Sequence, residues 1–124
     1  MRIAELKGYQ LVSIDEQKIV VKKGEKSYIL QIEEDEGDCC GYNDIVTELF
    51  ISGEELKRNP IITDIEMLVD EDGNGESCKV TFFGEYKPMA KLNTYSSSGS
   101  GWTYGAAVTL VCDALELNEG LSSW

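Results

Sequence analysis

Short runs of apolar residues, many of them alternating with polar ones, recur along almost the whole chain. They cover residues 9–14, 18–23, 27–33, 44–51, 61–69, 77–84, 90–95 and 104–115. Alternation with a period of two is typical of strands that bury one face, and short polar turns separate the runs. Parallel strands need crossovers of about a dozen residues or more, so turns this short favour antiparallel pairing. The pattern predicts a mainly β (α+β) fold, either a single antiparallel sheet or a small sandwich of about seven strands.

One segment, Glu54–Arg58, predicts a single helical turn among these strands. Ser52 or Gly53 can cap its start, and its acidic residues precede its basic ones, as the helix dipole prefers. Pro60 disfavours continuation of the helix at the residue before it. We therefore expect one short helix in the fold.

The length of the chain limits it to one hydrophobic core. With 124 residues, of which 42% are hydrophobic, we expect a single folded acidic domain over residues 1–124 with a loose tail at 120–124. No apolar run approaches the ~20 residues of a membrane-spanning helix. Residues 1–7 carry charges where a signal peptide is apolar. These features predict a cytoplasmic protein that does not bind membranes.

The acidic residues are concentrated in the middle of the chain. The net charge is −12, and residues 27–76 alone hold fifteen acids against Lys57 and Arg58, a net of −13. A surface of that sign repels a phosphate backbone, so we expect no direct binding of nucleic acid. It can attract a basic protein surface, including a groove that normally holds DNA. The alternative is that the acids only keep the protein soluble.

Several kinds of catalytic and cofactor chemistry are missing from the sequence. The chain has no histidine, which excludes Ser-His-Asp and Cys-His catalysis and histidine-ligated metal sites. Gly99-Ser100-Gly101 precedes a strand-like run and lacks the lysine of a phosphate-binding loop. We therefore predict a protein without enzymatic activity, cofactor or metal.

The segment Asp70–Gly75 matches the first half of a calcium-binding EF-hand loop. It has oxygen ligands at the first, third and fifth positions and glycine at the sixth, but the twelfth position holds Thr81 instead of an acid. Asp-Gly and Asn-Gly are also strong signals for a hairpin turn. We expect a plain turn, with adventitious calcium binding as the alternative.

Four cysteines, Cys39, Cys40, Cys78 and Cys112, are expected to be reduced in a cytosolic protein. Their spacing lacks the C-x₂₋₄-C pairs of thiolate zinc sites. Cys78 and Cys112 lie in apolar runs, which predicts that they are core residues. The acidic neighbourhood of Cys39 and Cys40 should raise the pKa of both thiols, so we expect packing at the end of a strand and no reactive thiolate.

Aromatic residues flank the small, flexible segment 96–101. Tyr95, Trp102 and Tyr104 could anchor an interface, or they could pair across strands and hold a hairpin together. A candidate partner-binding surface combines Trp102 and Tyr104 with the acidic stretch that precedes the two adjacent cysteines. It consists of Glu33, Glu34, Asp35, Glu36, Asp38, Trp102 and Tyr104.

The sequence contains three short segments that together resemble a known family. They lie at the adjacent cysteines, at the helical turn and at the Ser/Gly segment. They are Asp38-Cys39-Cys40, then Gly53–Leu56 followed by Asn59-Pro60-Ile61, and finally Ser98–Gly105. This combination resembles an uncharacterised family of small phage and prophage proteins with an Asp-Cys-Cys signature. The similarity covers roughly residues 20–115 and departs at Gly41, where the family usually has an acid, and at Arg58-Asn59, where it usually has Gly-Ser. The resemblance implies no activity, but it implies a phage or prophage accessory protein that acts in the bacterial cytoplasm.

These observations support three functional hypotheses. The first is a non-enzymatic accessory protein that binds a host or defence protein, with its acidic face against a basic surface. The second is a protein that binds or sequesters a small molecule such as a nucleotide signal, using Phe82, Lys87, Lys91, Tyr95 and Trp102. The third is a structural or assembly protein of the virion, in which edge strands pair between subunits. A homo-oligomer is compatible with all three.

Overall fold

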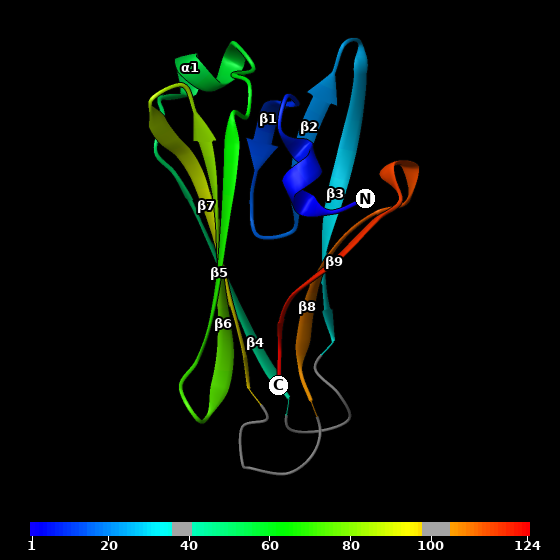
Figure 1. Ribbon diagram of the computed structural model, residues 1–124, viewed down its shortest axis with the longest axis vertical. Coiled ribbons are helices and arrows are strands. Elements are labelled where there is room, and N and C mark those ends of the chain that lie inside the picture. Colours follow the sequence, from blue (N-terminus) through cyan, green and yellow to red (C-terminus); the bar gives the residue numbers. More distant parts are fainter. Residues whose placement is uncertain (36–40, 98–104) are drawn as a thin grey trace.

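Nine strands, counted over the described residues, form two antiparallel sheets that face each other as the layers of a sandwich (Figure 1). The structure is a computed structural model that describes residues 1–35, 41–97 and 105–124. The first sheet has the strand order β1-β2-β3-β8-β9, and the second has the order β4-β7-β6-β5. The bounds are β1 Gln10–Ile14, β2 Lys18–Lys23, β3 Lys26–Asp35, β4 Tyr42–Leu49, β5 Asp64–Glu71, β6 Gly75–Gly84, β7 Lys87–Ser97, β8 Ala107–Cys112 and β9 Leu117–Ser123. The mainly β prediction is confirmed, with nine strands where about seven were expected.

Turn residues set several of the strand boundaries, as the sequence predicts. β2 and β3 form a two-residue hairpin at Gly24-Glu25, where Gly24 has a φ of 64° that favours glycine. β5 and β6 join through a turn in which the Asp72 carboxylate accepts hydrogen bonds from the amides of Asn74 and Gly75, both at 2.9 Å. That segment is therefore the hairpin turn that its Asp-Gly and Asn-Gly pairs predict.

The helix α1, Gly53–Lys57, is the predicted helical turn. Ser52 caps its start, because the Ser52 hydroxyl accepts a hydrogen bond from the Glu55 amide at 3.1 Å. Asn59, with a φ of 50°, and then Pro60 follow its end. The capping residue and the proline thus bracket the helix as the sequence suggests.

The segment that follows α1 links the two sheets along β1. The Ile62 amide donates to the Tyr9 carbonyl at 2.8 Å, and the Leu11 amide donates to the Pro60 carbonyl at 2.9 Å. The start of β1 is therefore hydrogen bonded on its outer edge as well. The chain begins with the 3₁₀ helix η1, Ile3–Leu6, which the sequence pattern did not predict and which buries its two largest apolar side chains in the core.

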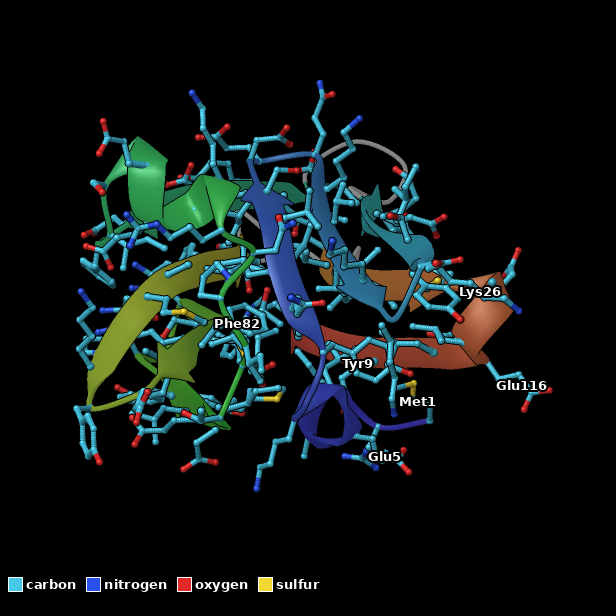
Figure 2. All side chains as sticks on the ribbon, turned by 90° about the horizontal axis from the view of Figure 1, so that it is seen from above. Met1, Glu5, Tyr9, Lys26, Phe82 and Glu116 are labelled. Atoms are coloured by element: carbon cyan, nitrogen blue, oxygen red, sulfur yellow. The ribbon has the colours of Figure 1, made fainter. Side chains whose placement is uncertain are left out.

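The apolar residues that alternate along the strands fill the space between the sheets. Fully buried members include Leu11, Ile19, Val21, Leu30, Val80, Phe82, Leu92 and Leu110. Phe82 is marked in Figure 2, which looks along the long axis of the sandwich. Burial of a side chain of this size stabilises a fold by about 1.5–3 kcal/mol. The period-two pattern of the sequence is thus the pattern of the core.

The C-terminal segment differs most from the prediction. The single strand expected over residues 104–115 is interrupted by the 3₁₀ helix η2, Asp113–Leu115, which reverses the chain. A loose tail was expected at residues 120–124, but β9 pairs with β8 there and buries Leu121. The reversal contains no Gly, Pro or Asn, and Glu116 supplies its left-handed φ of 54°. Asp113 is the one residue of this reversal that turns favour, so the sequence signal for the turn is weak.

Cys78 and Cys112 are buried free thiols, which confirms their prediction as core residues. Burial, with a further contribution from the charges of Glu76 and Glu119, raises the pKa of Cys78 to about 11. The Cys78 thiol is therefore protonated at neutral pH and is a poor nucleophile. The adjacent cysteines at positions 39 and 40 lie outside the described residues.

Candidate functional site

The interior of the sandwich becomes polar toward the end where β3, β7 and β9 finish. Thr94, Ser96 and Ser122 are buried there between the sheets. The Thr94 hydroxyl donates to Ser122 Oγ at 2.9 Å, and the Ser96 hydroxyl donates to Asn43 Oδ1 at 2.7 Å. The Oγ atoms of Ser96 and Ser122 are 2.8 Å apart, and the Ser96 proton is already donated, so Ser122 donates to Ser96. This chain of four polar groups joins the two sheets.

Exposed carboxylates surround the same end of the molecule, which we term the acidic end. Its residues are Glu33, Glu34, Asp35, Asp44, Asp70, Glu71 and Asp72, and all seven are exposed. They come from the end of β3, the start of β4 and the β5–β6 turn, which lie at one end of the sandwich in Figure 1. The described residues of these segments include no lysine or arginine. Three segments without a lysine or arginine among their described residues thus contribute seven of the 23 acids of the chain.

Specific contacts hold these segments in place. Asn43 Nδ2 donates to the Asp35 carbonyl at 3.2 Å and so ties the start of β4 to the end of β3. In the second sheet one row of register partners contains Asp44, Tyr95, Ser77 and Asp70. Neighbouring strands are ~4.8 Å apart, which places the first and last members of this row about 14 Å from each other. The spacing of the carboxylates is thus set by strand pairing.

Asp72 is the most constrained carboxylate of the acidic end. In addition to the two turn amides, it accepts a hydrogen bond from the Tyr95 hydroxyl, at 3.3 and 3.4 Å to its two oxygens. The amide of Asn74, then that of Gly75 and the Tyr95 hydroxyl, lower the pKa of Asp72, which stays ionised at neutral pH. Burial, and then the charge of Asp72, raise the pKa of Tyr95, so the Tyr95 hydroxyl remains a donor.

Tyr42 and Tyr95 form an aromatic pair beside these carboxylates. Their ring centroids are 6.1 Å apart in an edge-to-face arrangement, and Tyr42 is 50% exposed. The Tyr95 ring covers Gly75, where a Cβ atom would overlap it. Tyr42 was not among the predicted site residues. Its alternation with Asn43 and Asp44 places it on the outer face, so the sequence does contain a signal for it.

The residues predicted for partner binding fall into two groups. Glu33, Glu34 and Asp35 are exposed at the end of β3 and belong to the acidic end. Glu36, Asp38, Trp102 and Tyr104 lie outside the described residues, so their part in a binding surface stays a prediction. The structure therefore describes three of the seven residues predicted for this surface.

The residues predicted for the alternative small-molecule site do not line one pocket. Phe82 is fully buried between the sheets, whereas the alternation of β7 places Lys91 and Tyr95 on the outer face of the second sheet. Lys87, at the start of β7, binds Glu55 of α1 with 2.8 Å between Nζ and Oε2. The prediction of a shared pocket is corrected for Phe82, because its side chain points into the core whereas those of Lys91 and Tyr95 point to the outer face.

Two further features bear on ligand binding. In the part of the chain that the structure describes, no group of three or more His, Cys, Asp and Glu side chains is placed to hold a metal ion. A groove of about 560 Å³ lies next to the end of α1, between β1 and the segment that follows the helix. Arg58 and Glu85 are its charged residues, and none of the residues predicted for ligand binding lines it.

Comparison with known proteins gives no match, because no family model, no curated protein and no solved structure is significantly similar to the chain. The resemblance to a phage and prophage family therefore stays a prediction. Within residues 1–35, 41–97 and 105–124, no helix is long and apolar enough to span a membrane.

Proposed function

We propose that this chain is a non-enzymatic binding protein whose acidic end recognises a basic surface on another protein. The observation that carries the proposal is the gathering at one end of seven exposed carboxylates from three segments whose described residues include no lysine or arginine. Carboxylates at fixed spacing can match a pattern of lysines and arginines, whereas acids that only confer solubility need no such grouping. A host or defence protein as the partner, and a phage or prophage setting, rest on the sequence resemblance and belong to the same proposal.

The aromatic pair supports recognition at the same end. Tyr42 is half exposed next to Asp44 and close to Tyr95, which is hydrogen bonded to Asp72. Interface residues that contribute most to affinity are enriched in tyrosine and tend to lie in the centre of a contact. Carboxylates would steer the encounter, and Tyr42 would slow dissociation. Trp102 is retained from the sequence prediction as a second anchor.

The test starts with capture of a partner from bacterial lysate on the wild-type chain, followed by binding kinetics with the captured protein. The test variant combines Glu33→Gln, Glu34→Gln and Asp35→Asn. The matched control combines Glu25→Gln, Glu54→Gln and Glu85→Gln, at exposed positions outside the acidic end. Both variants change the net charge from −12 to −9, so they differ only in where the charge is removed.

We expect the test variant to associate about tenfold more slowly at low salt and to show a flatter salt dependence, because steering depends on local charge. The control variant should change the association rate by less than about twofold. Tyr42→Ala should instead speed dissociation about 30-fold, which corresponds to about 2 kcal/mol. Equal effects of the two triple variants, or no captured protein, would refute recognition by the acidic end.

A further inference from the structure

β3 is an inner strand of the first sheet, but half of its length has a strand partner on one side only, which leaves an open edge there. On one side β2 pairs with residues 26–31 of β3, whereas on the other side β8 pairs only with residues 31–35. Figure 1 shows β3 continuing past the β8–β9 turn toward its own hairpin tip. Within the described residues, the β8 side of residues 26–30 therefore has no strand neighbour.

The hydrogen-bond register shows which backbone groups point into this gap. The Ile32 amide donates to the Gln17 carbonyl at 2.9 Å, so the even-numbered residues of β3 direct their backbone groups toward β2. In an antiparallel pair these directions alternate from residue to residue. Ser27 and Ile29 consequently direct their amides and carbonyls to the open side.

The gap is accessible and partly apolar. A groove of about 390 Å³ lies between Tyr28 and Ile29 of β3 and Asp113 and Ala114 of η2. Ile29 is 48% exposed, which is unusual for an isoleucine in the middle of a ten-residue strand. An exposed edge with unpaired amides and carbonyls is a template for a further strand.

We infer that this open edge of β3 pairs with the same edge of a second copy of the chain. The first sheets of the two copies then form one continuous sheet. In an antiparallel pair around a two-fold axis, Tyr28 lies opposite Tyr28 of the other copy, and Ser27 lies opposite Ile29. Ser27 and Ile29 are the residues with backbone groups on the open side, so this register forms four hydrogen bonds. The open segment extends from the hairpin turn to the start of β8 pairing, and the same segment of the second copy matches it in length.

The charges at the two ends of the gap complement each other in this arrangement. Lys23 and Lys26 lie at the hairpin tip, whereas Asp113 and Glu116 lie at the η2 turn. Figure 2 shows Lys26 and Glu116 on the same flank of the molecule. Antiparallel pairing brings the tip of each copy next to the η2 turn of the other, so lysines approach acids at both ends of the contact.

β5 is an edge strand of the second sheet, and unlike the open part of β3 it carries acidic side chains along its length. Asp64, Glu66, Asp70 and Glu71 occur along its eight residues. Charged side chains on edge strands disfavour pairing, and two copies of β5 would bring like charges together. β5 therefore provides a control edge for the contact that the open amides, the matching length and the charges assign to β3.

The first test is sedimentation velocity of the full chain over a wide range of concentration. At about 0.15 M salt the Debye length of about 8 Å screens the repulsion between two copies of charge −12. A contact this short should be weak, so we expect a reversible dimer with a dissociation constant between about 1 µM and about 1 mM.

Ile29→Lys should abolish the dimer. Leu68→Lys, the same change at a position of β5 that is 56% exposed, should leave it intact.

Two further measurements locate the contact. Lys26→Glu and Asp113→Lys should each weaken the dimer about tenfold, and the combination should restore it, because the charge pair is re-formed in reverse. Hydrogen exchange of the Ser27 and Ile29 amides should slow about tenfold at high concentration, while that of Tyr28 should not change. A monomer at every concentration would overturn the inference. So would a dimer that survives Ile29→Lys, or one that forms without protection of these two amides.

Discussion

The two ends of the sandwich are held together by different chemistry. Near α1, apolar side chains such as Phe82 and Ile62 fill the interior. At the acidic end the interior holds Thr94, Ser96 and Ser122, which are hydrogen bonded across the sheets. Apolar burial has no preferred direction, whereas each hydroxyl bond fixes a distance and an angle. Apolar burial at the α1 end thus contributes stability without a preferred direction, whereas directional bonds position the end that presents the charged surface.

The largest effect is expected from a cavity at the α1 end. Phe82→Ala removes a fully buried ring and should lower the free energy of unfolding by about 3–5 kcal/mol. Urea unfolding should show a lower midpoint with an unchanged slope. Phe83→Ala is the matched control, because Phe83 is the next residue of β6, points to the outer face and is only half-buried. Equal losses from the two variants would contradict the division of β6 into a core face and an outer face.

A smaller effect is expected at the acidic end. Ser122→Ala removes the middle of the hydroxyl chain, so Thr94 loses its acceptor and Ser96 loses its donor. Leaving buried polar groups unpaired in this way should cost about 1–2 kcal/mol. Thr94→Val removes only the first donor and keeps the shape of the side chain, so it should cost less than about 1 kcal/mol. The double variant should lose less than the sum of the two, and strictly additive losses would show that the hydroxyls do not act as a chain.

Most strands could be predicted from the sequence because one face of each is less exposed than the other, and a period of two is visible without knowledge of the partner strand. The last strand could not. Glu119 occupies a core position of β9, where its carboxylate accepts hydrogen bonds from Arg2 Nε at 3.1 Å and from the Ile3 amide at 3.2 Å. These partners come from the other end of the chain. A local pattern with an acid at a core position is indistinguishable from an exposed tail.

The acids of the candidate site were visible in the sequence, but their convergence was not. Asp35 and Asp70 come from different sheets. The Asn43 side chain ties the end of β3 to the start of β4, and the pairings β4–β7, β7–β6 and β6–β5 bring Asp70 to the same end. Pairing between strands distant in the sequence depends on the burial of the whole sheet, so a local pattern cannot supply it. The same holds for the aromatic pair, because Tyr42 and Tyr95 become neighbours only through the β4–β7 register.

The smallest effect is expected from Asp72→Asn, and its size should depend on pH. Hydrogen bonds from the Asn74 and Gly75 amides and the Tyr95 hydroxyl lower the pKa of Asp72 in the folded protein. A carboxyl group of this kind stabilises the fold above its unfolded pKa of about 3.9, and this contribution is lost as the pH falls through the lower folded value. The asparagine oxygen can still accept the turn amides, so the variant should fold. It should be slightly less stable than the wild type at pH 7, and the difference should disappear as the pH falls through the lowered folded pKa of Asp72.

Urea unfolding of both proteins from about pH 2 to about pH 8 measures this difference. Asp44→Asn is the matched control, because Asp44 is an exposed acid of the same end that lies at the start of β4 and not in the turn. Removing that charge relieves repulsion among neighbouring acids, so the control should be at least as stable as the wild type at neutral pH. Phe82→Ala, in contrast, should lose the same free energy at every pH, since no titrating group is changed. If the Asp72→Asn curve instead runs parallel to that of the wild type over the whole range, the Asp72 charge does not order the turn, and strand pairing and the hydroxyl chain position the acidic end without it.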